Sequence, residues 1–211
     1  MPESARITVL AGVNGAGKST IQGAMIRARG CDYFNPDEAA GQILAANPSA
    51  SIEQANAAAW QEGVRLVRRA IAERLDLVLE TTLGGKTITG LLEQALDDGI
   101  EVRVWYVGLD SPERAVDRVA GRVARGGHAI PEETIRARYP KSLENLIRLL
   151  PRLAALRVFD NSVEADPIAG REPKLLLVLS MERAQILETC PLERAPAWAK
   201  PVLEAALRAG D

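Results

Sequence analysis

The stretch "GVNGAGKST" at residues 12–20 decides the fold of this chain, because it has the form of a phosphate-binding loop. It follows the apolar run 6–11, which we predict as a strand, and it opens a predicted helix from Lys18 to about Arg29. Its letters fit the pattern G-x-x-x-x-G-K-[ST] without a mismatch. The alternative is a chance glycine-rich turn. The position between a strand and a helix disfavours that alternative, because phosphate binding needs both neighbours.

Each residue type in this loop has a chemical reason to be there. The glycines let consecutive backbone N–H groups turn toward an anion, and the helix that follows adds its positive end. Lys18 can bridge the β- and γ-phosphates of a nucleotide, and the Ser19 hydroxyl can bind Mg²⁺. The predicted nucleotide-binding residues of the loop are Gly12, Asn14, Gly15, Ala16, Gly17, Lys18, Ser19 and Thr20.

The composition is that of a globular protein and argues against several classes. The chain has 211 residues and a net charge of −2, whereas nucleic-acid binding usually requires a strongly basic balance. Cys31, Cys190 and the single His128 give no support for a zinc site or a disulfide framework. The sequence shows neither a signal-peptide pattern nor an apolar run long enough to cross a bilayer. We therefore expect a cytoplasmic protein without membrane or nucleic-acid partners.

The alternation of strands and helices predicts an α/β P-loop fold with three layers, in which a parallel, doubly wound sheet has helices on both faces. Asn35 suits the cap of the helix that begins at Pro36. The predicted strands are 6–11, 31–35, 75–82, 100–109 and 157–162. The predicted helices are 18–29, one from Pro36, 51–75, 86–98, 110–125, a short one within 126–139, and 140–156.

The pattern changes after Asp166. The runs 174–180 and 183–188 predict a hairpin, and a terminal helix follows at about 197–208. We expect a P-loop kinase domain at 1–165 and an α/β extension at 166–211 that packs on the same domain.

Acidic side chains follow two of the predicted strands. Asp37 in "FNPDEAA" lies just beyond strand 31–35, whose carboxyl end faces the same crevice as the phosphate-binding loop. A carboxylate there could accept a proton from a substrate hydroxyl. An acid at a helix start is also favoured by the helix dipole, so the residues alone leave both interpretations open.

The segment "LETTLGG" at 79–85 ends a dense apolar strand and carries polar groups into the same crevice. Glu80 could hold a Mg²⁺-bound water or a sugar hydroxyl, and Thr81 and Thr82 could contact the substrate. An acid at the end of a buried strand is costly without a partner, which favours a functional role over a plain strand end.

Arginines recur at helical spacing in the second half of the chain. Arg114, Arg118, Arg122 and Arg125 form one stripe, and for the first two we expect a solvated face. Arg125 and Arg138 bracket a segment with Gly126-Gly127 that also contains His128. Such a segment can close over a nucleotide and bring guanidinium groups to the transferring phosphoryl group.

The polar end of the last core strand, "FDNS" at 159–162, is ambiguous. Asn161 could touch the adenine base, although a plain turn explains the same letters equally well.

Several of these stretches together resemble the zeta-toxin-like P-loop kinases, which are also labelled predicted ABC-type ATPases. The resemblance covers about residues 5–163, and its most specific part is "RVARGGHAIPEETIRARYPKSLENL" at 122–146. The other matching stretches are "AGVNGAGKST", "FNPDEAA", "LETTLGG" and "FDNS".

This resemblance implies phosphorylation of a sugar hydroxyl of UDP-N-acetylglucosamine, or of a related UDP-sugar, with ATP and Mg²⁺. It also implies a separate antitoxin protein as a possible partner. The implied roles are phosphate and metal binding for Lys18 and Ser19, proton acceptance for Asp37, substrate contacts for Glu80 and Thr82, and lid closure for Arg125 and Arg138.

Three other functions compete with this one. An ABC-type or motor ATPase needs an LSGGQ-type signature, which "TLGGK" at 82–86 resembles only superficially. A nucleoside, nucleotide or aminoglycoside kinase would share the loop, the base and the arginines, and would differ only in its pocket. A noncatalytic nucleotide-binding protein is disfavoured by the intact Lys18, Ser19 and Asp37.

Overall fold

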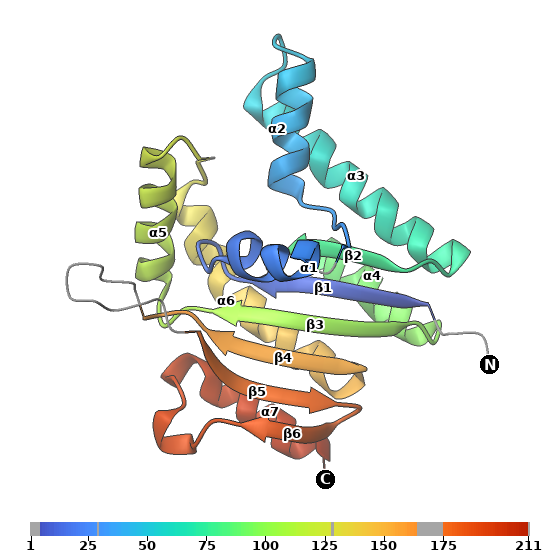
Figure 1. The fold of residues 1–211 in the computed structure, drawn as a ribbon, viewed down its shortest axis with the longest axis vertical. Helices are drawn as coiled ribbons and strands as arrows, with labels where there is room; N and C mark the ends of the chain where they lie inside the picture. The colour runs from blue at the N-terminus through green and yellow to red at the C-terminus, as the bar shows by residue number, and fades with distance from the viewer. Residues whose placement is uncertain (1–4, 29, 128, 164–174, 211) are drawn as a thin grey trace.

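A computed structural model describes residues 5–28, 30–127, 129–163 and 175–210. Its centre is a six-stranded sheet in the order β2-β1-β3-β4-β5-β6 (Figure 1). The strands are β1 (Arg6–Gly12), β2 (Leu77–Thr81), β3 (Glu101–Gly108), β4 (Ala155–Asp160), β5 (Leu176–Glu182) and β6 (Gln185–Thr189). The predicted strands 6–11, 75–82, 100–109 and 157–162 agree with β1 to β4 to within two residues.

The first four strands are parallel, and this arrangement creates the functional edge of the sheet. β1 pairs with β2 and β3, and β3 pairs with β4, all in parallel register. Since parallel strands end at the same edge, the segments that follow Gly12, Thr81, Gly108 and Asp160 emerge together. The last two strands run antiparallel to their neighbours, as the predicted hairpin requires.

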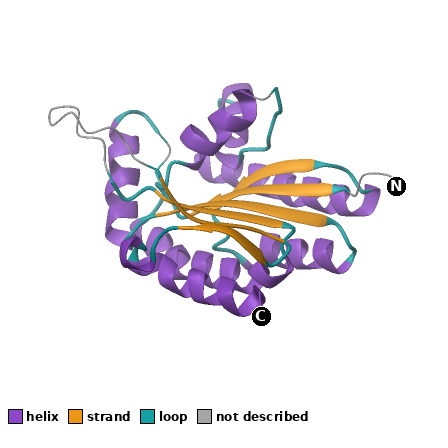
Figure 2. Cartoon of the chain, turned by 60° about the horizontal axis from the view of Figure 1, so that its bottom comes forward, coloured by secondary structure: helices purple, strands orange, loops and turns teal. Residues whose placement is uncertain are grey.

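Most helices lie on one face of the sheet. The main core cluster joins Ile7 and Val9 of β1 to buried residues of α3, α4, α6 and α7, and Figure 2 shows the C-terminal helix within this layer. On the opposite face Leu10 packs against Ile26 of α1. The helices are α1 (Ala24–Ala28), α2 (Pro36–Ala46), α3 (Ile52–Glu73), α4 (Lys86–Asp97), α5 (Pro112–Ala124), α6 (Glu132–Leu149) and α7 (Lys200–Gly210).

The strand predicted at 31–35 is wrong. Only Phe34 pairs, in a single parallel bridge with Leu79 at the edge of the sheet. Pro36 begins α2 two residues later, with Asn35 as its cap, so no length remains for a regular strand. The bridge still holds this segment beside β2, which is what positions the start of α2.

The helices around 126–156 also differ from the prediction. A single helix, α6, runs through Pro140, where we expected two separate helices. Proline lacks the N–H group of a regular helical turn and normally ends or kinks a helix. Here Ile135 on one side and Leu146 and Leu149 on the other are buried in the core, so tertiary packing outweighs the local preference.

The helix after the phosphate-binding loop has an unexpected start. Residues Ser19–Gly23 form one π-helical turn before α1 begins at Ala24. Such turns are rare and occur mostly at functional sites.

The segment after residue 174 is joined to the same sheet and core. β5 extends the sheet beyond β4, and the ring of Trp198 lies 6.1 Å from that of Tyr106 in β3. The indole N–H of Trp198 donates to Asp160 Oδ1 at 2.8 Å. These contacts join residues 175–210 to the sheet and its core, while the division of the chain near residue 165 stays a prediction. No helix in the described part of the chain has the length and apolarity of a membrane span.

We predict that Trp198→Ala lowers the free energy of unfolding by about 3–5 kcal/mol, because it opens a cavity beside Tyr106 and removes the indole donor from buried Asp160. Urea denaturation followed by circular dichroism measures this change. The matched control is Leu192→Ala in the same segment, which is 64% exposed and should change stability by no more than about 0.5 kcal/mol. If Trp198→Ala changed the free energy of unfolding as little as Leu192→Ala, the C-terminal segment would not stabilise the core.

Candidate active site

A cleft of about 1550 Å³ lies over the carboxyl edge of the parallel strands. It is lined by the phosphate-binding loop, the starts of α2 and α4, one side of α3, the loop after β2, and residues of α5 and α6. The predicted site residues that line it are Asn14, Gly15, Gly17, Lys18, Ser19, Thr20, Asp37, Glu80, Thr81, Thr82, Arg125, Arg138 and Asn161. The structure therefore brings together residues from five separated parts of the sequence: 14–20, Asp37, 80–82, the pair Arg125 and Arg138, and Asn161. Of the predicted residues, Gly12 and Ala16 do not line the cleft.

The phosphate-binding loop is shaped by the close approach of β3. A Cβ atom on Gly12 would lie 2.1 Å from the carbonyl oxygen of Val107, and Gly12 has a φ of +144°, which favours glycine. Ala16 is fully buried, and its N–H donates to the carbonyl of Val13. These two residues therefore support the loop from behind. Any contact of these two residues with the nucleotide would be made by their backbone groups, and it stays a prediction.

Lys18 is held inside the loop. Its Nζ donates to the carbonyl of Val13 at 3.1 Å and lies 3.9 Å from Glu80 Oε1, and the residue is only 7% exposed. Burial lowers the pKa of Lys18, and the negative charges of Glu80 and Asp37 oppose that shift. The ammonium thus sits where added negative charge, such as a phosphate, would stabilise its protonated form.

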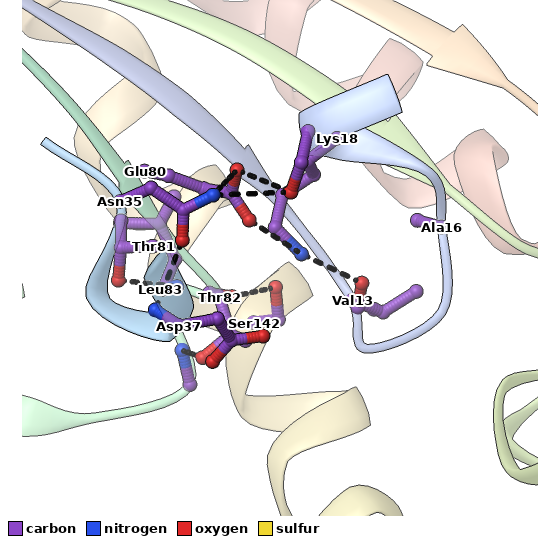
Figure 3. A network of polar contacts seen from close by, with 12 residues as sticks. Val13, Ala16, Lys18, Asn35, Asp37, Glu80, Thr81, Thr82, Leu83 and Ser142 are labelled. Atoms are coloured by element: carbon purple, nitrogen blue, oxygen red, sulfur yellow. Dashed lines mark hydrogen bonds and ion pairs between the residues drawn. The ribbon is translucent and has the colours of Figure 1, made fainter. Parts of the chain in front are cut away.

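The side chains of Ser19 and Glu80 are in contact beside the Lys18 ammonium. The Ser19 hydroxyl donates to Glu80 Oε2 at 2.8 Å. The other carboxylate oxygen of Glu80 points to the Lys18 ammonium (Figure 3). The Asn35 amide lies 3.4 Å from Ser19 Oγ, 3.5 Å from Glu80 Oε2 and 3.2 Å from Glu38 Oε1. Burial raises the pKa of Glu80, against the effects of the Lys18 charge and the Ser19 hydrogen bond.

This oxygen cluster fits Mg²⁺ in its chemistry. The ion is usually held by one or two protein oxygens together with phosphate oxygens and water. A hydroxyl and a carboxylate already in contact beside the loop supply such a donor pair. The metal-binding role of Ser19 and Glu80 remains a prediction.

Asp37 lies in the first turn of α2, where the Asn35 side chain accepts hydrogen bonds from the N–H groups of Asp37 and Glu38. The carboxylate of Asp37 is therefore not needed as a cap. It reaches across the cleft to Arg122 of α5, with 3.3 Å between Asp37 Oδ2 and the guanidinium. Both side chains are partly exposed, so this pair contributes at most about 1 kcal/mol and can be displaced by a ligand.

The arginines of α5 and α6 form the far wall of the cleft. Arg125 is the C-cap of α5, Arg138 lies on α6, and both line the cleft, while His128 lies outside the described residues. Their role in a lid stays a prediction. Arg118, for which we expected a solvated face, lines the cleft together with Arg122. The sequence signal for both was the spacing of four and three residues that places them on one stripe with Arg125.

The loop after β2 is braced by α6. Thr81 Oγ1 accepts from the N–H of Leu83, which has a left-handed backbone with a φ of +54°. Ser142 Oγ donates to the carbonyl of Thr82 at 2.5 Å, and the Asn145 amide donates to that of Leu83 at 2.6 Å. The threonine hydroxyls thus stabilise the turn, and their predicted substrate contacts are untested.

Sequence reasoning missed Ser142 and Asn145. Their spacing of four and three residues after Arg138 places all three on one face of α6, and this pattern could have identified them. One face of α6 therefore carries Arg138, which lines the cleft, and Ser142 and Asn145, which hold the loop after β2.

Asn161 has a structural role that the sequence did not suggest. Its side-chain N–H donates to the carbonyl of Ala16 at 2.9 Å, so the end of β4 holds the phosphate-binding loop. Asn161 also lines the cleft, and a contact with adenine stays a prediction.

Comparisons with solved structures support this fold. A crystal structure of AvrRxo1-ORF1:-ORF2 with ATP aligns with a TM-score of 0.63 at 15% identity, covering 96% of this chain and 64% of the other. The present chain thus spans just under two thirds of that relative. A structure of the PezAT chromosomal toxin–antitoxin system of Streptococcus pneumoniae aligns with a TM-score of 0.54 at 16% identity, covering 82% of this chain and 75% of the other.

Sequence comparisons identify the family. A Haemophilus influenzae protein described as uncharacterized is 31% identical over 128 residues, which is 61% of this chain and 88% of that protein. The model of the Zeta toxin family matches residues 2–167, which include the phosphate-binding loop, Asp37, Glu80 and the arginines of α5 and α6. The chain therefore belongs to the Zeta toxin family.

Proposed function

We propose that this protein is an ATP- and Mg²⁺-dependent kinase that phosphorylates a sugar hydroxyl of UDP-N-acetylglucosamine or of a related UDP-sugar. The observation that carries the proposal is the presence of a carboxylate, an ammonium and several guanidinium groups in one cleft. Asp37, a carboxylate with no structural duty as a helix cap, lines the same cleft as buried Lys18 and the arginines of α5 and α6. A cleft built only to bind a nucleotide would have no need for this carboxylate.

The loop residues would bind and orient the phosphates. Gly15, Gly17, Lys18 and Ser19 line the cleft, where the backbone N–H groups of such a loop would bind phosphate oxygens. The Lys18 ammonium would donate to two phosphate oxygens. When bound at Ser19 and Glu80, Mg²⁺ supplies positive charge that offsets the charge on the phosphates.

Asp37 would act on the acceptor. In the proposed reaction it accepts the proton of the sugar hydroxyl while that oxygen forms a bond to the γ-phosphorus and the bond from this phosphorus to the β–γ bridging oxygen breaks. The arginines stabilise the charge on the transferring group, and those of α5 can close the cleft against water. Asp37 must first part from Arg122, which their half-exposed contact permits.

The UDP-sugar and a separate antitoxin are the family-based parts of the proposal. The zeta-toxin-like motifs imply the acceptor, and one structural relative, PezAT, is described as a toxin–antitoxin system. ATP in the AvrRxo1-ORF1:-ORF2 crystals supports the choice of donor. The proposal places the protein in the cytoplasm.

The direct test is a screen of ATP consumption across UDP-sugars, nucleosides and aminoglycosides, with product masses recorded. We expect ADP formation that depends on a UDP-sugar, and a product heavier than that sugar by one phosphoryl group. Phosphorylation of a nucleoside or an aminoglycoside instead would give the kinase another acceptor. Steady ATP hydrolysis without any acceptor-dependent product would contradict kinase activity.

Asp37→Asn should reduce phosphotransfer by at least about 10²-fold, because the amide cannot accept the proton. ATP affinity, measured by calorimetry, should change little. Glu38→Gln is the matched control: it also removes one charge at the start of α2, keeps an oxygen near Asn35, and should retain most activity. Equal activity of the two variants would remove Asp37 from the mechanism.

Arg138→Ala should lower kcat by about 10²–10³-fold, since a guanidinium that neutralises a transferring phosphoryl group contributes at least that much. The matched control is Arg136→Ala. Arg136 lies two residues earlier on α6, pairs with Glu113 and Glu132, and does not line the cleft. Steady-state kinetics of both variants test the assignment, which fails if Arg136→Ala is as slow as Arg138→Ala.

A further inference from the structure

One side of α3 forms a wall of the cleft that neither the phosphate-binding loop nor the arginines explain. Four residues of α3 line the cleft, at spacings of three, four and three, which places them on one helical face. They are Glu53, Asn56, Trp60 and Gly63.

The exposure of Trp60 is not explained by a structural role in the core. It is 51% exposed, and no other aromatic side chain in the described part of the chain belongs to the strongly exposed large apolar residues. The residues of α3 that hold the helix to α2 are different ones, Ala55 and Ala59, which are buried against Ala40. An indole left half in water above a cleft is suited to covering an apolar ring face of a ligand.

Because α2 packs on α3, Trp60 of α3 and Asp37 of α2 lie at similar positions along the helix pair. A Cβ on Gly63 would lie 2.9 Å from the ring of Phe34, so these two residues are in contact. Ala59, one turn before Gly63 on α3, packs with Ala40 of α2. Asp37 comes between Phe34 and Ala40 in the chain, which places it beside the turn of α3 between Ala59 and Gly63 that contains Trp60. Both side chains line the cleft, and α2 and α3 run side by side in Figure 1.

This wall is on the acceptor side of the cleft. The nucleotide base is expected near Asn161, which follows β4 and holds the phosphate-binding loop from the β3 side of the sheet. Phe34 and β2 lie on the opposite side of β1, and α3 is packed against them. The loop thus separates Trp60 from the expected position of adenine.

We propose that Trp60 is the platform on which the ring that carries the reacting hydroxyl is held, with that hydroxyl directed to Asp37. The inference rests on the proposed function and deepens it, since it requires an acceptor with a pyranose ring whose apolar face covers the indole. Asn56 and Glu53 lie on the preceding turns of α3 and line the same cleft, where their polar groups face the rest of the acceptor.

The first test is steady-state kinetics with UDP-N-acetylglucosamine. Trp60→Ala should raise the KM for this acceptor about tenfold, with kcat within about threefold and the KM for ATP unchanged. Trp60→Phe should restore most of the affinity, because it keeps an aromatic face. Gln61→Ala, at an exposed neighbouring position that does not line the cleft, is the control and should match the unaltered protein. An unchanged acceptor KM in Trp60→Ala, or a raised KM for ATP, would overturn the assignment.

The second test is direct binding by tryptophan fluorescence. N-acetylglucosamine 1-phosphate, which has the sugar but no base, should quench the fluorescence of the unaltered protein, and Trp60→Phe should lose this response. Quenching by uridine but not by the sugar phosphate would mean that Trp60 holds the base, and would overturn the proposal for the hydroxyl-bearing ring.

Failure of the proposed function is distinguishable from failure of this inference. If only a nucleoside or an aminoglycoside is phosphorylated, the UDP-sugar is wrong, and the Trp60 kinetics are repeated with the acceptor found. A raised KM for that acceptor supports the platform, and an unchanged KM rejects it. ATP hydrolysis without any acceptor rejects both proposals.

Discussion

The structure depends on how closely the chain leaving β1 can pass β3. The carbonyl of Val107 stands where any side chain at residue 12 would begin, so only glycine allows the backbone to turn there into the phosphate-binding loop. Because β1 is central in the parallel part of the sheet, this turn fixes the loop over the edge where β2, β3 and β4 also end. The positions of Lys18 and Ser19 follow from that single backbone contact.

The second constraint is the burial of charge. Lys18 and Glu80 are both removed from water, and each limits the cost of burying the other, while Ser19 and Asn35 supply hydrogen bonds to the carboxylate. The bridge between Phe34 and Leu79 brings Asn35 to this cluster. One short strand contact therefore connects the loop, the end of β2 and the start of α2, where Asp37 lies.

The fold and much of the site could be predicted from the sequence because the signals are local: the loop motif, apolar runs and helix caps. What could not be predicted depends on partners distant in the chain. From the sequence alone, Pro140 indicates a helix boundary, because the packing that keeps α6 continuous is not visible there. Residues 31–35 likewise have the composition of a strand, although only Phe34 pairs. The contact of Arg122 with Asp37 joins residues 85 positions apart, and no periodicity within α5 reveals it.

The placement of Asp37 and Trp60 on a single hairpin of helices has a consequence for how such enzymes can diversify. Under the proposed function, the nucleotide is bound at the sheet edge, whereas the groups that face the acceptor belong to α2 and the first half of α3. Those parts pack on each other, while the second half of α3 packs in the main core. Changes on the outer side of that helix pair can alter which molecule is modified without disturbing the energy source. Under the proposed function, donor and acceptor recognition belong to different structural elements, which selection or engineering can change independently.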